Sequence, residues 1–317
     1  MTTDDLPRGV PPGTTWDELA HLVEKLRRIP DRVRILDRTP HWAWTRLRLR
    51  PELLSCLTEL GLPRRTAEDG LLYDRYDLAN SAMQLGQGPL ARSARRFWPI
   101  AMDRVDAGTS TRYEMKYQMR CPDPGHGPVC HYLLTLPGGE VVARDVPAGE
   151  TMPDVTVEIV PEIDWPELPD RMRAPLAAVG ELDFMLLREE IRRDLSFVRD
   201  SGLADCAGTA ILVVEEARKL GLRARASFGC VVAPPFGVEH YWAELLVGDR
   251  WLPVDPVLIR QMVVWGVLDG DRWPPHRSIG PLVARIGDLG VPLVRHEGEE
   301  IPSTLPVRLL TEPVGAA

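Results

Sequence analysis

One cysteine at the start of a predicted helix is the residue of this chain best suited to covalent chemistry. The stretch "SGLADCAGTAILVVEEARKLG", residues 201–221, is typical of a loop followed by an amphipathic helix that ends at Gly221. Asp205 is expected to cap this helix, which places Cys206 in its first turn. The unpaired N–H groups and the positive helix dipole favour a thiolate there and can hold an oxyanion. Cys206 is therefore a candidate nucleophile, although a lone helical cysteine more often serves packing.

Two segments after this helix predict a β-hairpin that carries a histidine and an aspartate. "HYWAELLV" and "RWLPVD" flank residues 248–249, "GD", which are typical of a two-residue turn. Such a turn pairs Val247 with Arg250. Counting back from this pair puts Asp255 on the same face as His240, one diagonal step away. A carboxylate that holds one ring nitrogen leaves the other to act as a general base, so these two residues are predicted to form a catalytic pair.

These three residues and their surroundings resemble the transglutaminase-like superfamily of the papain-type fold. The resemblance covers about residues 180–260 and rests on "DCAGTAILVVEEARKLGLRARASFG" and "HYWAELLVGDRWLPVDP". It implies that Cys206 is the nucleophile, that His240 in H-x-W-x-E is the general base, and that Asp255 in W-x-x-x-D-P orients the histidine. The fold that it implies is a catalytic helix packed on an antiparallel sheet.

Three further residues are expected to support this site. Asp205 caps the helix, Trp242 packs near the imidazole, and Trp251 supports the hairpin. One position departs from the family pattern, because many members carry a glycine two residues before the cysteine. This chain has Ala204 there, and its glycine is Gly202.

The rest of the chain predicts an α+β protein in which a helical N-terminal segment and a small β-rich segment precede the papain-like core. "TWDELAHLVEKLRRI" opens with a capping box, "TRYEMKYQMRC" alternates like a strand, and "ELDFMLLREEIRRDLSFV" is predicted to be one helix. Two more strands are expected around the "GG" turn of residues 138–139. The expected divisions are a flexible tail at 1–15, a helical region at 16–105, a β-rich segment at 106–165 and a catalytic domain at 170–312.

The composition excludes several classes of protein. The net charge of −8 over 317 residues, without a dense Lys/Arg stripe, argues against a nucleic-acid partner. Neither a secretory signal nor a run of about 18 apolar residues occurs, so a cytoplasmic protein without a membrane partner is expected. The five cysteines are an odd number without the spacing of a disulfide framework.

The segment "CPDPGHGPVCH" is a second cluster of residues able to bind a metal. Cys121, His126, Cys130 and His131 have the spacing C-x4-H-x3-C-H, which matches none of the common structural zinc patterns. Zinc ligation, a disulfide and a plain hairpin with Cys121 and Cys130 on its facing ends remain open, and the hairpin is favoured. His296 is expected to be a surface loop residue, as is His276, and no metal or cofactor is expected. Cys56 and Cys230 are expected in the core.

The function expected from these residues is acyl transfer through a Cys206 thioester. The acyl donor would be a thioester or an amide, free or bound to a carrier protein, and the acceptor would be an amine. The resemblance extends to stand-alone bacterial members that join acyl thioesters to amines in small-molecule biosynthesis. Two alternatives stay open: a cysteine peptidase or amidase that uses water, and an inert scaffold or carrier-protein partner.

Overall fold

The structure, a computed structural model, describes residues 14–123, 125–150 and 152–310. Almost all of the tail expected at residues 1–15, and the last two residues of the expected catalytic domain, lie outside this range. The chain divides into two compact units: Met1–Arg96 with Leu182–Gly208, and Phe97–Glu181 with Thr209–Ala317. The fold is α+β with antiparallel sheets, as expected.

The first unit combines helices with a small sheet of order β1-β3-β2, which the sequence did not predict among the expected helices. Its elements are α1 (Trp16–Arg27), η2 (Asp31–Val33), β1 (Leu36–Arg38), α2 (Pro40–Trp42), η3 (Ala43–Leu47), α3 (Pro51–Glu59), β2 (Arg64–Ala67), β3 (Gly70–Asp74), α4 (Arg75–Gln84), β8 (Asp183–Phe184), α7 (Glu189–Arg192), α8 (Leu195–Ser201) and β9 (Leu203–Ala204). The predicted capping box is confirmed at α1, where Thr15 Oγ1 accepts from the Glu18 N–H and Glu18 Oε2 accepts from the Thr15 N–H. Helix α5 (Pro89–Asp106) crosses into the second unit.

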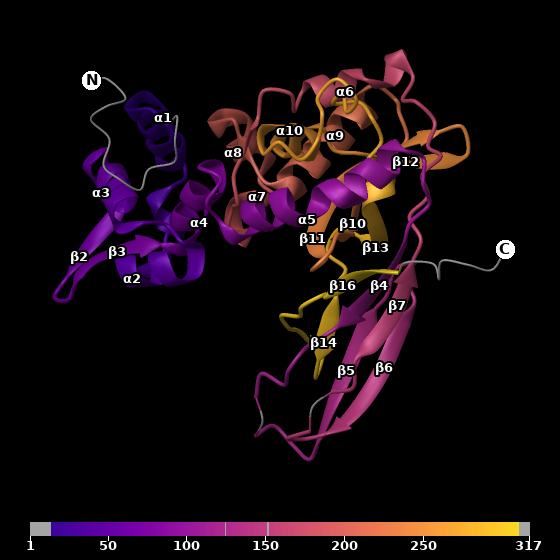
Figure 1. Ribbon diagram of the computed structural model, residues 1–317, viewed down its shortest axis with the longest axis horizontal. Coiled ribbons are helices and arrows are strands. Elements are labelled where there is room, and N and C mark those ends of the chain that lie inside the picture. The colour runs from indigo at the N-terminus through magenta and orange to yellow at the C-terminus, as the bar shows by residue number, and fades with distance from the viewer. Residues whose placement is uncertain (1–13, 124, 151, 311–317) are drawn as a thin grey trace. The chain divides into compact units, whose positions relative to one another are not determined.

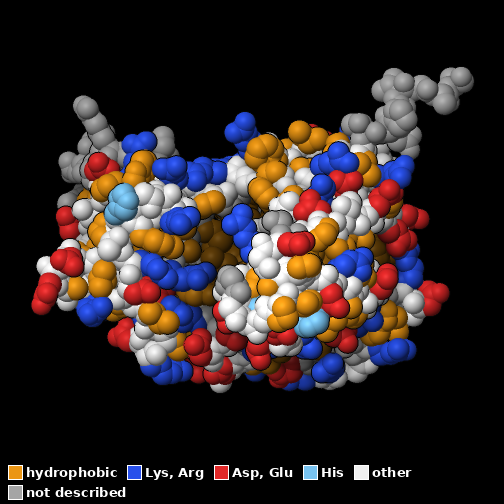
Figure 2. Space-filling model, turned by 90° about the horizontal axis from the view of Figure 1, so that it is seen from below, with side chains coloured by type: hydrophobic (Ala, Val, Ile, Leu, Met, Phe, Trp, Pro, Cys, Tyr) orange, Lys and Arg blue, Asp and Glu red, His pale blue; other side chains and the backbone are white. Residues whose placement is uncertain are grey.

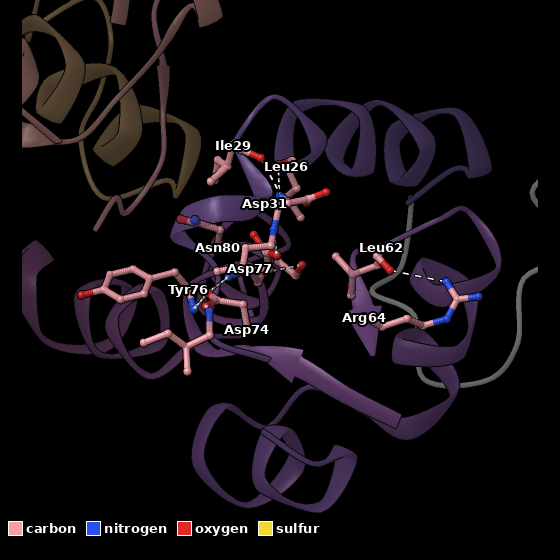
Figure 3. Close-up of polar contacts among 12 residues, drawn as sticks. Leu26, Ile29, Asp31, Leu62, Arg64, Asp74, Tyr76, Asp77 and Asn80 are labelled. Atoms are coloured by element: carbon pink, nitrogen blue, oxygen red, sulfur yellow. Dashed lines mark hydrogen bonds and ion pairs between the residues drawn. The ribbon is translucent and has the colours of Figure 1, made fainter. Parts of the chain in front are cut away.

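A buried arginine ties the elements of the first unit together. The Nε of Arg34 donates to Asp77 Oδ2 at 2.8 Å, and its two Nη groups donate to the carbonyls of Ile29 at 2.7 Å and Leu26 at 2.6 Å. These acceptors are labelled in Figure 3, beside Asp31, which Arg34 also contacts. The guanidinium therefore donates hydrogen bonds both to a carbonyl at the end of α1 and to the Asp77 carboxylate of α4.

Replacement of this arginine should destabilise the protein strongly. Arg34→Ala leaves the buried Asp77 carboxylate and two carbonyls without their donor, so we expect the free energy of unfolding to fall by about 3–5 kcal/mol in urea titrations. Asp31→Asn is the matched control. Its side chain is 94 % exposed, and we expect a change below about 1 kcal/mol. Equal effects of the two substitutions would contradict this assignment.

The second unit contains three antiparallel sheets. Their strand orders are β12-β11-β10-β13, β15-β14-β5-β6 and β16-β4-β7. The elements are β4 (Arg112–Tyr117), β5 (Val129–Thr135), β6 (Val141–Pro147), β7 (Val155–Ile159), η4 (Asp170–Met172), α6 (Ala174–Ala177), β10 (Ala224–Val231), β11 (Val238–Val247), β12 (Arg250–Val254), α10 (Pro256–Val264), η5 (Gly280–Leu282), β13 (Val283–Asp288), β14 (Val294–His296), β15 (Glu299–Glu300) and β16 (Val307–Leu310). Helix α9 (Cys206–Lys219) begins in the first unit and continues into the second.

Two predictions about local structure were wrong. The expected hairpin across "PDPGHGP" does not form, because β4 pairs with β7 and β16 while β5 pairs with β6 and β14 (Figure 1). The hairpin around the "GG" turn of residues 138–139 is confirmed as β5–β6. The single helix predicted over 181–198 is instead β8, α7 and α8. The Asp194 carboxylate caps α8 by accepting from the N–H groups of Ser196 and Phe197, and so starts a new helix.

Among the described residues, no helix combines the length and the apolar character that crossing a membrane requires. Acidic and basic side chains are mixed over much of the face seen in Figure 2. That mixture agrees with a chain of 46 acidic and 38 basic residues.

Candidate active site

Cys206 is the first residue of helix α9, as predicted. Asp205 precedes it, and the Oδ1 atom of Asp205 accepts from the Gly208 N–H at 3.0 Å, which is the geometry of an N-cap. The Cys206 side chain is half-buried, whereas Cys56, Cys130 and Cys230 are buried. The remaining N–H groups of this first helical turn therefore lie beside a sulfur that solvent can reach.

An arginine that was not predicted from the sequence fixes this turn. The Arg192 Nε lies 2.7 Å from Asp205 Oδ2, and its Nη2 lies 4.0 Å from Cys206 Sγ. The buried Asp205 carboxylate thus caps the helix with one oxygen and pairs with the guanidinium through the other. A positive charge is placed next to the thiol, where it would stabilise an anionic sulfur.

Gly208 allows the start of α9 to pack closely on the preceding chain. A Cβ atom at this position would lie 2.9 Å from the Arg192 carbonyl oxygen and 3.2 Å from Val198 Cγ2. The glycine that departs from the family pattern, Gly202, ends α8 with φ +69°. Ala204, which stands at the family's usual glycine position, is buried in β9.

The predicted hairpin register is confirmed. Val247 pairs with Arg250 across the two-residue turn, and Ala243 pairs with Val254. The next position along this ladder sets Trp242 against Asp255, on the face that carries His240. The turn residues therefore determined the register correctly.

His240 and Asp255 form a buried pair. The Nε2 atom of His240 lies 2.8 Å from Asp255 Oδ2, and the two residues are 6 % and 2 % exposed. Because an ionised carboxylate only accepts hydrogen bonds, this contact places the imidazole proton on Nε2 and leaves Nδ1 as the basic nitrogen.

The same carboxylate starts helix α10. Asp255 Oδ1 accepts from the N–H groups of Val257 at 3.0 Å and Leu258 at 2.9 Å, so Asp255 is the N-cap of α10. One oxygen therefore serves the helix and the other serves the histidine. This double use fixes the orientation of the carboxylate plane toward His240.

A connected polar network supports the imidazole from the same sheet face. The Trp242 ring stacks near His240 with centroids 6.3 Å apart and an interplanar angle of 18°. Its indole Nε1 donates to the buried Glu244 at 3.2 Å, and Arg225 Nε donates to the other Glu244 oxygen at 2.5 Å. The Arg225 guanidinium lies 4.3 Å from the centre of the Trp251 ring. Trp242 therefore lies beside the imidazole, and Trp251 lies beside the guanidinium of Arg225.

Gly229 leaves the room that Trp242 needs. It pairs with His240 across β10 and β11, and a Cβ here would approach the Ala284 carbonyl oxygen to 2.0 Å and the Trp242 ring to 2.7 Å. This residue was not predicted from the sequence to belong to the site. A glycine inside a strand pattern is the signal of close backbone approach that could have found it.

The cluster of possible metal ligands predicted from "CPDPGHGPVCH" has a different fourth member in the structure. His131 is exposed and its Nδ1 lies 2.8 Å from Asp145 Oδ1, away from the cysteines. The prediction that His296 lies at the surface was wrong. His296 ends the inner strand β14 and is buried. It lies with Cys121, His126 and Cys130. His276 is half-buried in a loop.

The cysteines expected in the core are confirmed there. Cys56 and Cys230 are both buried, and burial raises the pKa of each thiol, to about 12 for Cys230. Neither thiol is suited to form a thiolate near neutral pH.

Of the predicted catalytic residues, Cys206 belongs to the first unit, and His240 and Asp255 to the second.

Comparison with known proteins supports the expected resemblance. Residues 189–256 match the family model of the transglutaminase-like superfamily. No curated protein matches the chain. Among solved structures, a "putative cysteine protease" from Cytophaga hutchinsonii is 10 % identical, with a TM-score of 0.35 over 65 % of this chain and 93 % of that chain. The resemblance to the superfamily is confirmed over a segment that includes Cys206, His240 and Asp255.

Proposed function

We propose that this protein is a cysteine acyltransferase that passes an acyl group from a Cys206 thioester to an amine. Cys206 is the nucleophile, His240 the general base and acid, and Asp255 the residue that orients the histidine. The observation that carries the proposal is the buried His240–Asp255 pair, whose carboxylate is oriented by the cap of α10. The pair lies in the same superfamily match as the helix-start cysteine.

In the first step, the Cys206 sulfur attacks the acyl carbonyl carbon. The thiol proton passes to Nδ1 of His240, a C–S bond forms, and the developing oxyanion is held by N–H groups at the start of α9. The bond to the leaving thiol or amine then breaks, and the imidazolium returns its proton to the leaving group. The product of this step is the acyl-enzyme. The guanidinium of Arg192 stabilises the anionic sulfur, and Asp255 stabilises the imidazolium.

In the second step, an amine attacks the thioester carbon. His240 takes a proton from the attacking nitrogen, a C–N bond forms, and the C–S bond breaks. The sulfur leaves as a thiol after receiving that proton, so the enzyme returns to its starting state. With water in place of the amine, the same sequence releases a free acid.

An amine is favoured over water because the base is shielded. The side chain of His240 is 7 % exposed and is flanked by the fully buried Trp242, so bulk water has little access to the imidazole. Limited access of bulk water to the base favours an acceptor that is delivered by binding. The donor is proposed to be a thioester or an amide, free or attached to a carrier protein.

The acceptor can be tested by product analysis. Purified protein is incubated with acyl thioesters and activated amides, each with and without simple primary amines. We expect amide product only in the presence of amine. Without amine, free acid should form at least about tenfold more slowly than the amide forms with amine. Equal release of free acid with and without amine would identify a peptidase or amidase instead.

A second readout separates an enzyme from an inert scaffold. If no donor leaves a mass adduct and iodoacetamide fails to alkylate Cys206 in the folded protein, the proposal of an enzyme fails. Cys230 is the internal reference, since its burial and raised pKa should keep it unmodified until the protein unfolds.

A further inference from the structure

Four side chains with metal-binding atoms converge in the second unit. The ligand atoms of Cys121, His126, Cys130 and His296 all lie within 4.8 Å of one another. The first two belong to the segment between β4 and β5, the third lies on β5, and the fourth ends the neighbouring strand β14. Pairing of β14 with β5 is therefore what brings a histidine from the end of the chain to the cysteines.

The geometry is close to that of tetrahedral zinc. Zn–N bonds of about 2.0–2.1 Å and Zn–S bonds of about 2.3 Å imply ligand atoms about 3.3–3.8 Å apart. His126 Nε2 already lies 3.3 Å from Cys130 Sγ. The rings of His126 and His296 meet edge to face, at 75° with centroids 4.6 Å apart. A contraction of about 1 Å at the widest pair would close the site.

One buried nitrogen lacks a hydrogen-bond partner. His296 is 4 % exposed, and among the described residues its Nε2 atom meets no donor or acceptor. An unpaired buried polar atom costs about 1–3 kcal/mol. Coordination of a metal ion by this nitrogen would remove that cost.

The ligand chemistry selects the metal. Two thiolates and two imidazoles in a tetrahedral arrangement suit zinc, and the absence of oxygen ligands among these four side chains disfavours calcium and magnesium. A carboxylate stands outside the ligands, because Glu297 Oε1 lies 4.0 Å from His126 Nδ1. Such an outer carboxylate commonly orients a metal-bound histidine.

We propose that Cys121, His126, Cys130 and His296 bind a structural zinc ion. Four protein ligands leave no open position, so the ion does not act on a substrate. It ties the segment between β4 and β5 to β14. This site is independent of the proposed acyl transfer and involves none of the residues assigned to it.

Metal analysis tests the proposal directly. The protein is purified without a histidine tag under reducing conditions, stripped with a chelator and titrated with Zn²⁺ or Co²⁺ alone. We expect about one metal ion per chain, and a Co²⁺ spectrum with the intense visible bands of tetrahedral thiolate coordination. His296→Ala should weaken metal binding at least about tenfold.

His131→Ala is the matched control, since His131 lies next to Cys130 in sequence but faces Asp145. It should bind the metal as the wild type does. Equal loss in both variants, or wild-type protein that binds no Co²⁺ after reduction, would overturn the proposal. If His296→Ala does not fold by circular dichroism, the wild-type Co²⁺ titration and His126→Ala, at the less buried loop ligand, decide the question.

Discussion

Asp255→Asn is expected to lower kcat/KM for acyl transfer by about 10⁴-fold while the protein stays folded. The reason lies in the two partners of the carboxylate. Val257 and Leu258 present N–H groups to Oδ1, so only an oxygen can occupy that place. The amide NH₂ of the asparagine must then face His240. It would force Nε2 to accept and Nδ1 to carry the proton, which removes the base.

The stability of this variant should change little, because the asparagine oxygen still caps α10. Asp255→Ala differs in this respect, since it also removes the cap and should cost about 1 kcal/mol of stability. Asp269→Asn is the matched control, at an exposed aspartate whose Oδ1 accepts from the Asp271 N–H. Both activity and unfolding in urea should be measured. A rate for Asp255→Asn within tenfold of wild type would contradict the proposed role.

Cys206→Ala is expected to abolish the acyl-enzyme and to lower turnover by at least about 10⁴-fold. No other group of the proposed site can form the thioester. Intact-protein mass spectrometry after incubation with acyl thioesters should detect the acyl mass on wild type and no mass increment on the variant. The same spectra identify which donors are accepted.

The control for this variant is Cys56→Ala, at a buried cysteine of α3 whose pKa is raised by burial. It should acquire the acyl mass as the wild type does. An acyl adduct that persists in Cys206→Ala would place the nucleophile elsewhere and would refute the mechanism. Peptide mapping of that adduct would then locate the true residue.

The parts of the site fixed by local rules could be predicted from the sequence. The turn at residues 248–249 set the hairpin register, and through it the face shared by His240 and Asp255. The start of α9 followed from Asp205 and the apolar spacing after it. The capping role of Asp255 was also readable in principle, because proline follows it at a helix start.

Features that depend on distant pairing could not be predicted. Strand β5 pairs with β14, so the fourth ligand of the proposed zinc site is His296, and the neighbouring His131 was a misleading candidate. Arg192 reaches Asp205 from a separate short helix, which no local pattern announces. The wrong hairpin between β4 and β5 has the same origin, since alternation identifies a strand but not its partner.

The His240–Asp255 pair needs more of the chain than the hairpin that carries it, because α10 shares the carboxylate of Asp255. The superfamily match ends at residue 256, yet the N–H groups that hold Oδ1 belong to residues 257 and 258. The Asp255 carboxylate is thus held in its orientation toward His240 only when the first turn of α10 forms. A hairpin cut at the end of the match and grafted onto another scaffold would carry the histidine and the aspartate, but not the backbone that holds the carboxylate toward the imidazole.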